Sequence, residues 1–552
     1  MVKDTMCSSS NRSYTEISDD ESEIIHEIVC KASDVPEGTQ KMVDVRERKI
    51  LIVNDEGEYH AVNGLCPHFN LSLENGVYSE GKIRCSYHGA CFDVKTGDIE
   101  DFPAFDNLHS FDVRREGSDL VLRTTAKCLE SDRRARKHKL GTSQIQKKPI
   151  IVVGGGTAGQ SVVENLRLAG CQRRIIMLTM EVQPPYDRVY ASKFYSPDLP
   201  PLRTNEWYNE NDIEVRCNSE VISLDAERHS ITLADSTTMQ YSKLVLAPGV
   251  RARRFPGRGG NLKGVHNLTN VVDMKAVRAE SEGKKLVCIG GSFIGMESAG
   301  GLNGLASSVT LICSSNEPLI AYGEDIGRAY RKRWESNGVS VYRNTSVEFI
   351  EGDEQGTVKE VVLRCGERIP AQVVVVGIGC APDTEWLRDE GMEMDERGFV
   401  LVNERFETSI EDIYAIGDVV SAPLPFWGFK TLNIQHFQTA QHHGHMAAFA
   451  IEGKPKPYKS IPFFWTYGMD KGARMAGYNE GYDDVHVYGN VEKFEWVKYY
   501  FRNGMVVAVS TTGAVTPPTA IQFLTLCHQG IRITKEEVLR NPSNDWSSLL
   551  NK

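Results

Sequence analysis

The chain has 552 residues, of which 41% are apolar and 25% are charged, a composition typical of globular proteins that predicts three or four domains at this length. Its formal net charge of −11 argues against nucleic acid as a partner, because nucleic-acid-binding proteins present a basic face. No apolar run reaches the roughly 18 residues that a membrane-spanning helix needs, so we expect no membrane span.

The first segment, 1–23, is polar and ends in an acidic run, which predicts a disordered tail. It contains neither the apolar stretch of a signal peptide nor the Arg-rich, acid-poor composition of a mitochondrial transit peptide. The thirteen irregularly spaced cysteines indicate reduced thiols rather than a disulfide framework. Together these features predict a cytoplasmic protein.

Residues 24–126 contain short β-like runs separated by glycines, which predicts a small all-β domain. Residues 127–147 then carry Arg133, Arg134 and Arg136 with few large apolar side chains. Such a segment could be a nuclear signal or a nucleic-acid patch. Its composition cannot support a core, which favours a basic, solvated linker between domains.

Two short groups of residues within the first domain indicate a metal centre. CPH at 66–68 and CSYH at 85–88 each offer one thiolate and one imidazole. In a Rieske [2Fe–2S] centre two cysteines hold one iron and two histidines hold the other. The alternative is a structural zinc site of the Cys2His2 type, whose ligand spacing differs. The segments GLCPH and CSYHGACFD also resemble those of Rieske ferredoxins. The predicted ligands are Cys66, His68, Cys85 and His88.

Two positions beside the second group concern the reduction potential of such a cluster. High-potential Rieske proteins of respiratory complexes place serine and tyrosine hydroxyls near the cluster, where this chain has Ala90 and Phe92. Hydrogen bonds to the cluster sulfurs raise the potential. We therefore expect a potential toward the lower end of the Rieske range of roughly −150 to +300 mV.

A strand at 150–153, a glycine-rich turn and a helix at 158–169 follow Pro149. The turn, GGGTAG, fits the G-x-G-x-x-G pattern, whose glycines let the backbone approach a pyrophosphate at a helix N-terminus. A carboxylate at the end of the next strand, 174–179, can accept a hydrogen bond from the adenosine ribose, although a solvated loop carboxylate is an equal alternative. The predicted contacts are Gly154, Gly156, Thr157, Ala158, Gly159 and Glu181.

The same strand, turn and helix recur at 285–302, which predicts a second dinucleotide site. Ser292 replaces the middle glycine of its pattern. After the following strand, 309–312, NADH-preferring enzymes place an acid, whereas this chain has Cys313-Ser314-Ser315. The sequence therefore leaves NADH and NADPH open. The predicted contacts are Gly290, Ser292, Gly295 and Glu297.

Further motifs resemble known flavoproteins. The segment 408–418 resembles the second FAD signature of the pyridine-nucleotide disulfide reductase superfamily, in which the last acid, here Asp418, binds the ribityl chain. With PYDRVYASK at 185–193 and FWT at 464–466, the chain resembles the Rieske-bearing branch of the apoptosis-inducing factor family. The resemblance implies NAD(P)H-linked oxidoreductase activity with bound FAD.

The resemblance also implies the domain plan. FAD-binding segments at 148–270 and 399–457 enclose an NAD(P)H-binding domain at 271–398, and a separate domain follows at 458–552. The predicted fold class is therefore multidomain: an all-β Rieske domain, two Rossmann-like α/β domains with one inserted in the other, and an α+β C-terminal domain.

Individual roles come from the same resemblance. Lys193 matches the lysine at the flavin ring and Glu297 the glutamate that pairs with it, so these two are the predicted catalytic residues. Arg188 lies in the same motif, and Trp465 matches an aromatic side chain near the isoalloxazine. The alternatives are a solvated Lys193 and ordinary core packing of Trp465. Val189 replaces a proline of the family motif, a change that could displace Lys193.

Four histidines, His436, His442, His443 and His445, lie within 433–445. A Rieske oxygenase needs two histidines and one carboxylate around a mononuclear iron. Because this segment contains no Asp or Glu, we expect no oxygenase chemistry.

Two functions remain. In the first, NAD(P)H passes electrons through FAD to the chain's own Rieske cluster and on to an unidentified acceptor. The alternative is a redox- or NAD(P)H-sensing protein with little turnover and a pro-apoptotic interaction role, as the family implies. The family also implies a mitochondrial location as the alternative to the cytoplasm, and a homodimer is compatible with the sequence.

Overall fold

The computed structural model describes residues 24–138, 148–196, 198–512 and 517–550. The predicted tail at 1–23 and the linker residues 139–147 lie outside the described residues. None of the described helices combines the length and hydropathy of a membrane span.

The N-terminal domain is built from β-strands in two principal sheets. Strand β3 reads RKILIVND and contributes to two apolar clusters, because its side chains alternate in direction. Ile50 and Ile52 pack into one apolar cluster, whereas Leu51 and Val53 pack into the other. A six-stranded sheet has the order β1 (Ile24–Lys31), β12 (Asp119–Thr125), β11 (Ser110–Glu116), β4 (Glu58–Asn63), β3 (Arg48–Asp55) and β2 (Gln40–Val45). The second sheet has the order β10 (Ile99–Asp101), β9 (Cys91–Asp93), β8 (Lys82–Arg84) and β7 (Val77–Ser79), beside a hairpin of β5 (Leu65–Cys66) and β6 (Leu71–Ser72).

Two parallel five-stranded sheets follow, each with the strand, glycine turn and helix that the sequence predicts. Their central strands are continuous apolar runs, such as IIVV and VVVV, because parallel sheets are buried on both faces. The first sheet has the order β15 (Ile213–Arg216), β14 (Ile175–Leu178), β13 (Ile150–Val153), β19 (Lys243–Leu246) and β31 (Ile413–Ala415). The second has the order β21 (Val265–Asn267), β28 (Val373–Val376), β22 (Lys285–Ile289), β23 (Ser308–Ile312) and β24 (Val339–Tyr342).

The chain order shows that one α/β unit is inserted in the other. Strand β31 completes the first sheet only after the whole second sheet has been formed. Strand β21 pairs with β28, so the second sheet begins at Val265, before the predicted boundary at 271. Smaller sheets are β16 (Val221–Asp225), β17 (Ser230–Leu233) and β18 (Thr238–Gln240); β20 (Val250–Ala252) and β29 (Cys380–Pro382); β25 (Val347–Gly352), β26 (Val358–Leu363) and β27 (Arg368–Pro370); and β30 (Val400–Leu401), β32 (Val420–Leu424) and β33 (Phe429–Leu432).

Helices flank these sheets. Helices α1 and α7 pack side by side, and Gly444 allows the close approach because a Cβ there would collide with Ser161. The helices of the two α/β units are α1 (Thr157–Leu168), α2 (Val189–Lys193), α3 (Asn205–Glu210), α4 (Val271–Ser281), α5 (Phe293–Gly301), α6 (Glu324–Ser336) and α7 (Phe437–Ile451).

The C-terminal domain is an antiparallel sheet with helices packed on it. Helix α8 packs on strands β35 and β38 of this sheet, and its buried residues include Phe523 and Leu524. The sheet order is β34 (Phe463–Gly468), β35 (Lys471–Gly477), β38 (Met505–Thr512), β37 (Glu495–Arg502) and β36 (Asp484–Asn490). The helices are α8 (Thr519–His528), α9 (Lys535–Arg540) and α10 (Ser547–Leu550).

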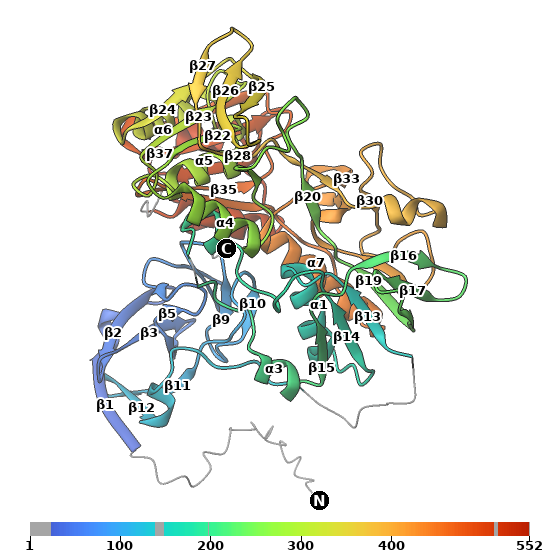
Figure 1. The fold of residues 1–552 in the computed structure, drawn as a ribbon. Coiled ribbons are helices and arrows are strands. Elements are labelled where there is room, and N and C mark those ends of the chain that lie inside the picture. Colours follow the sequence, from blue (N-terminus) through green and yellow to red (C-terminus); the bar gives the residue numbers. More distant parts are fainter. Residues whose placement is uncertain (1–23, 139–147, 197, 513–516, 551–552) are drawn as a thin grey trace, which may run out of the picture.

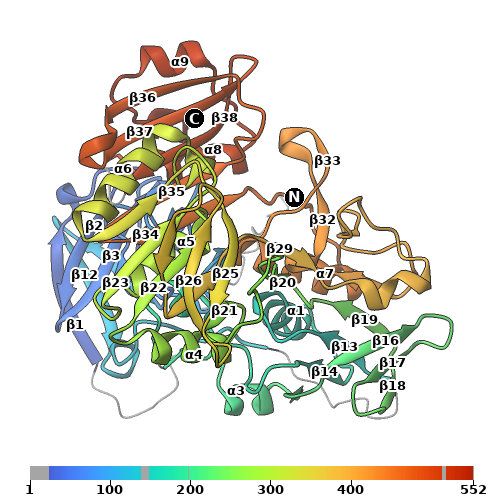
Figure 2. The same cartoon turned by 45° about the horizontal axis from the view of Figure 1, so that its top comes forward.

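The N-terminal domain lies against the rest of the molecule (Figures 1 and 2). Its Ser79 hydroxyl donates to the Leu550 carbonyl at 2.7 Å, which joins it to the C-terminal domain. The Gln438 amide on α7 donates to the Phe102 carbonyl at 2.7 Å, which joins it to the first α/β unit. The domain is thus held from two sides.

Candidate redox site

The four predicted metal ligands converge at one end of the N-terminal domain. Cys66 ends β5, Cys85 follows β8, and both are 1% exposed. The Nδ1 atoms of His68 and His88 are 3.2 Å apart. The two thiols are within hydrogen-bonding reach of each other, which raises the pKa of Cys66 and lowers that of Cys85. Burial lowers the pKa of His68 to about 3, so its imidazole is neutral, as metal ligation requires.

This donor set fits a Rieske cluster. Among the described residues, no three His, Cys, Asp or Glu side chains surround a single metal position. The four predicted ligands instead form a thiol pair and an imidazole pair, as two irons with separate ligands require. Tight turns support both groups, because Asn70 N donates to Cys66 O at 2.8 Å and Gly89 N to Cys85 O at 3.1 Å.

The first glycine turn, between β13 and α1, is shaped to hold a pyrophosphate. Gly154 has φ +120°, and a Cβ there would collide with the Ala247 carbonyl. A Cβ on Gly159 would collide with the Gly154 carbonyl, whereas Gly156 faces open space. Thr157 and Ala158 begin α1, so the helix N-terminus, which favours negative charge, opens on the same space.

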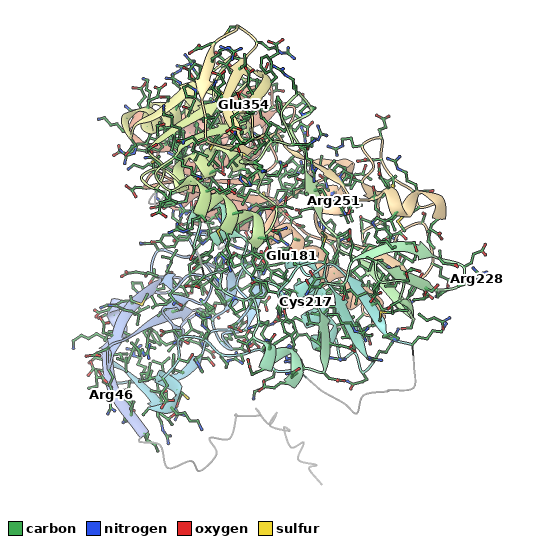
Figure 3. All side chains as sticks on the ribbon, in the orientation of Figure 1. Arg46, Glu181, Cys217, Arg228, Arg251 and Glu354 are labelled. Carbon is green, nitrogen blue, oxygen red and sulfur yellow. The ribbon has the colours of Figure 1, made fainter. Side chains whose placement is uncertain are left out.

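Glu181, Arg188 and Asp418 lie near this turn and interact electrostatically. Glu181 pairs with the Arg188 guanidinium and accepts from the Tyr186 hydroxyl, so its carboxylate is held in place. It lies near the centre of the molecule in Figure 3. Burial raises the pKa of Asp418 to about 6, against the opposing effect of the Arg188 charge. A partly buried carboxyl group of this kind suits hydrogen bonding to sugar or ribityl hydroxyls.

The second glycine turn repeats the design between β22 and α5. Gly290 also has φ +120°, and a Cβ there would collide with the Gly377 carbonyl. A Cβ on Gly295 would collide with the Gly290 carbonyl. Ser292, in place of the middle glycine, is exposed at the start of α5, and its side chain caps no backbone N–H of the helix. The turn therefore keeps the close packing of a dinucleotide fold.

Lys193 and Glu297 form a buried ion pair where three parts of the chain meet. The Lys193 ammonium on α2 donates to Glu297 Oε1 on α5, and the two side chains are 10% and 6% exposed. Ser192 donates to the other carboxylate oxygen at 2.7 Å, and Thr466 on β34 donates to Oε1 at 3.0 Å. A buried ion pair is stable only when further hydrogen bonds satisfy its remaining donors and acceptors in this way.

Trp465 connects this pair to the predicted metal ligands. Its ring centroid is 5.0 Å from that of His88 and 6.1 Å from that of His68. Successive side chains of a strand point to opposite faces. Trp465 therefore faces the imidazoles from one side of β34, while the next residue, Thr466, reaches Glu297 from the other.

Family models match both parts of the chain. The model of the Rieske [2Fe-2S] domain matches residues 26–112. The model of pyridine nucleotide-disulphide oxidoreductases matches residues 148–444, more than half of the chain. The chain belongs to the pyridine nucleotide-disulphide oxidoreductase family.

Relatives of this oxidoreductase match it over most of their own length. Apoptosis-inducing factor 3 from Homo sapiens is 34% identical over 95% of this chain and 88% of its own length. The biphenyl dioxygenase system ferredoxin–NAD(+) reductase component from Paraburkholderia xenovorans (strain LB400) is 34% identical over 62% of this chain and 84% of its own. The crystal structure of the covalent putidaredoxin reductase–putidaredoxin complex superposes with a TM-score of 0.67 at 25% identity, over 73% of this chain and 97% of that one.

These similarities confirm the predicted family, fold class and cofactors. The Rieske domain implies a [2Fe–2S] cluster, and the oxidoreductase domain implies FAD and NAD(P)H. The protein is a flavin-dependent NAD(P)H oxidoreductase of the ferredoxin reductase type with an added Rieske domain.

The four histidines of 433–445 separate in this oxidoreductase. His436 packs on Trp465 at 4.4 Å between ring centroids, His443 Nδ1 accepts from Gly417 N at 3.2 Å, and His445 contacts Asn165 at 2.8 Å. His442 lies 2.7 Å from an oxygen of Asp101, in the Rieske domain.

Asp101 is a buried carboxylate between domains that the sequence could not identify. The histidine segment has no carboxylate of its own, but the fold brings this one to it from more than three hundred residues earlier in the chain. Arg84 lies 2.6 Å and His528 3.2 Å from the other carboxylate oxygen. The carboxylate is thus enclosed by a guanidinium and two imidazoles from different domains and joins those domains.

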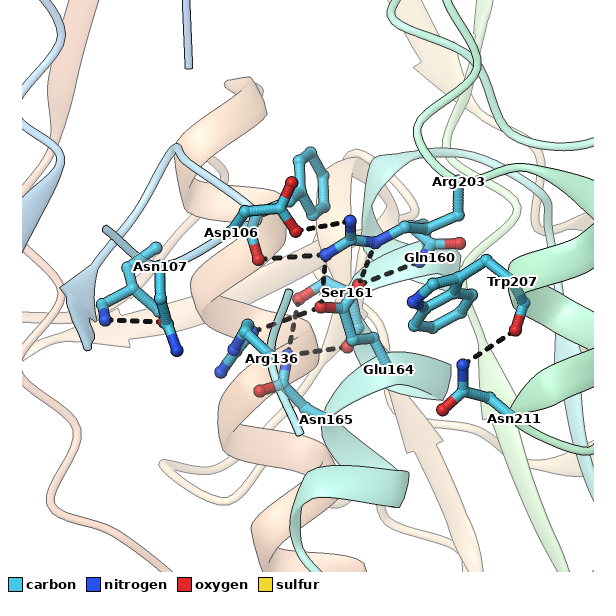
Figure 4. Close-up of polar contacts among 12 residues, drawn as sticks. Asp106, Asn107, Arg136, Gln160, Ser161, Glu164, Asn165, Arg203, Trp207 and Asn211 are labelled. Carbon is cyan, nitrogen blue, oxygen red and sulfur yellow. Dashed lines mark hydrogen bonds and ion pairs between the residues drawn. The ribbon is translucent and has the colours of Figure 1, made fainter. Parts of the chain in front are cut away.

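A second buried ionic group anchors the Rieske domain to α1 (Figure 4). Arg203 lies 2.7 Å from Asp106 of the Rieske domain and 2.9 Å from Glu164 of α1. Arg136 lies 3.5 Å from Glu164, which is 1% exposed. The expectation of a solvated linker is therefore wrong for Arg136. Its side chain is 12% exposed and belongs to this ionic group.

Proposed function

We propose that this oxidoreductase takes electrons from NAD(P)H, transfers them through FAD to its own Rieske cluster, and delivers them singly to an acceptor. The observation that carries the proposal is the position of Trp465, whose ring lies 5.0 Å from that of the cluster ligand His88 while Thr466 binds Glu297. When bound, FAD accepts an electron pair and releases single electrons, which matches a one-electron cluster.

The roles of individual residues are part of the proposal. Lys193 places a fixed positive charge where the flavin ring is expected, and such a charge stabilises a reduced, more negative ring. Glu297 holds the ammonium in place through its hydrogen bonds to Ser192 and Thr466. The first glycine turn with Glu181, Arg188 and Asp418 holds FAD.

The second glycine turn, with Gly290, Ser292 and Gly295, holds NAD(P)H. The Lys193–Glu297 pair joins the two α/β units that carry the first and the second turn. The nicotinamide and the flavin are then expected to meet at this pair.

Fusion of the two modules supports transfer within one chain. The Asp101 and Asp106 carboxylates each bind partners from the reductase part, so the cluster ligands are held against Trp465. A tethered carrier has a high effective concentration at its reductase and needs no diffusional encounter. One relative is named a ferredoxin–NAD(+) reductase component. This name supports a one-electron iron–sulfur protein or domain as the electron acceptor of such a flavoprotein.

The test is anaerobic stopped-flow absorbance after mixing the oxidised holoenzyme with NADH or with NADPH. We expect flavin bleaching followed by cluster reduction within one turnover. A His68→Ala variant should keep the first phase and lose the second. If the flavin bleaches only over many minutes, a sensing protein is the better account, and if the wild-type cluster stays oxidised, transfer within the chain is excluded.

A further inference from the structure

Three arginines gather at the carboxyl edge of the second parallel sheet. Arg331 on α6 binds Glu317 through Nε at 2.8 Å and Nη2 at 3.1 Å. Arg343, just after β24, lies 3.1 Å from the same carboxylate, and Arg328 lies 3.6 Å from it. Glu335 pairs with Arg331 at 2.8 Å. Three guanidinium groups therefore face two carboxylates, and the edge has an excess of positive charge.

This arginine edge, Arg328, Arg331 and Arg343, adjoins the second glycine turn. The loop 313–319 packs directly on the turn, because Leu319 N donates to Gly291 O at 2.7 Å and a Cβ on Gly291 would collide with Cys313. In Rossmann-like sheets the adenosine ribose lies at the end of the strand after the glycine turn, which here is β23. Arg343 contacts this loop directly, since it donates to the Asn316 carbonyl at 3.1 Å.

Glu317 cannot serve as the acid that binds the ribose hydroxyls of NADH. Its side chain is 2% exposed, and both of its oxygens accept hydrogen bonds from arginines. The arginines also hold the pKa of Glu317 below its ordinary value, so the group stays ionised and paired. The residues that face outward on this loop are Ser314 and Asn316, which carry no charge.

We infer that this edge binds the 2′-phosphate of NADPH, with Arg343 as the main contact, Arg328 as a second cation and Ser314 as a neutral hydroxyl beside them. The inference rests on the proposed function, in which the second glycine turn holds NAD(P)H. A phosphate carries about −1.5 to −2 charges at neutral pH, and a guanidinium can bind two of its oxygens at once. Arg343 and Arg328 are 37% and 50% exposed, so their outer faces can reach a ligand. Arg331, at 13% exposed, positions Glu317 instead.

The test uses the full holoenzyme and two fragments, 2′,5′-ADP and 5′-AMP, whose binding is measured by isothermal titration calorimetry. These fragments differ only in the 2′-phosphate. We expect 2′,5′-ADP to bind at least about tenfold more tightly, as one charge-assisted contact with a phosphate provides. Arg343→Ala should remove most of this difference and leave 5′-AMP within about twofold. Ser314→Asp, at an exposed position, should also reduce the difference, because its carboxylate repels the 2′-phosphate.

Arg228→Ala is the matched control. Arg228 is an exposed arginine at the outer edge of the FAD-binding part (Figure 3), where it pairs with Asp225 at 2.7 Å. Its loss should leave both affinities unchanged. Equal affinity of the wild-type protein for the two fragments would overturn the inference, as would an Arg343→Ala variant that loses both ligands equally.

The two levels of the argument can fail separately. If NADH bleaches the flavin rapidly and 2′,5′-ADP shows no advantage, the reductase stands and only the 2′-phosphate site is rejected. If 2′,5′-ADP binds tightly and neither nucleotide bleaches the flavin, the 2′-phosphate site stands and the proposed electron transfer is rejected.

Discussion

Trp465 of the C-terminal domain and His88 of the Rieske domain lie with their ring centroids 5.0 Å apart, although almost four hundred residues separate them in the chain. His436, at the start of α7, packs on the same indole at 4.4 Å. Three domains thus meet at one aromatic side chain, which places the reductase beside the predicted cluster ligands.

Replacing Trp465 with leucine should slow cluster reduction relative to flavin bleaching. The indole fills the space between the imidazoles and β34, so its loss lengthens the path and admits water. We expect the second stopped-flow phase to slow by about tenfold or more, with the first phase less affected. Trp386→Leu, at a partly buried tryptophan remote from the cluster ligands, is the control. Equal slowing in both variants would show a general loss of packing.

Lys193→Met should reduce the rate of flavin bleaching by about a hundredfold, because the positive charge that stabilises the reduced ring is removed. The change also leaves Glu297 buried without its cation, which destabilises a protein by roughly 3–5 kcal/mol. The double variant Lys193→Met/Glu297→Gln should regain most of that stability in thermal unfolding.

The double variant should not regain the rate. If it does, the lysine acts only through folding and not on the flavin. Lys332→Met, which removes an exposed lysine paired with Glu492, is the control for loss of a charge.

Stability should fall as the pH decreases below about 6.5, the ordinary histidine pKa. Burial lowers the pKa of His443 and of His445 to about 3 in the folded state. Between these values the unfolded chain binds protons that the folded chain does not, so acid favours unfolding. Each group contributes up to about 1.4 kcal/mol per pH unit in this window.

The measurement for this prediction is the chemical unfolding free energy at pH 7 and pH 5. His445→Gln keeps a hydrogen-bond donor for Asn165, which His445 contacts at 2.8 Å, and should reduce the pH dependence. An unchanged slope in this variant would assign the effect to other groups.

Arg474→Gln should lower the reduction potential of the cluster. The Arg474 guanidinium donates to the Tyr87 carbonyl, between the predicted ligands Cys85 and His88, and lies over the Tyr87 ring at 5.4 Å. A nearby cation stabilises the additional negative charge of the reduced cluster. A tenfold change in the one-electron equilibrium corresponds to about 59 mV.

The potential of the cluster is measured by EPR-monitored titration of the full chain. Arg474→Lys should retain most of the wild-type value, because it preserves the charge. A potential that does not change in Arg474→Gln would limit this arginine to holding the domains together.

The sequence by itself determined what depends on short spacing. The glycines at 154, 156 and 159 and at 290 and 295 each act within a single strand–turn–helix unit. The predicted Cys and His ligands lie two or three residues apart in their loops. Local backbone geometry and side-chain chemistry are enough to predict such units, and the family matches confirm the fold class and cofactors that they indicate.

Only the tertiary structure decided which of these units meet. No local pattern places Asp101 on His442, Arg136 on Glu164, or Trp465 on His88, because these contacts depend on how buried faces of separate domains pack. The same holds for Arg343 and Glu317. They follow the neighbouring parallel strands β24 and β23, which helix α6 separates in the chain. Buried charges require partners, and the fold alone determines where those partners lie.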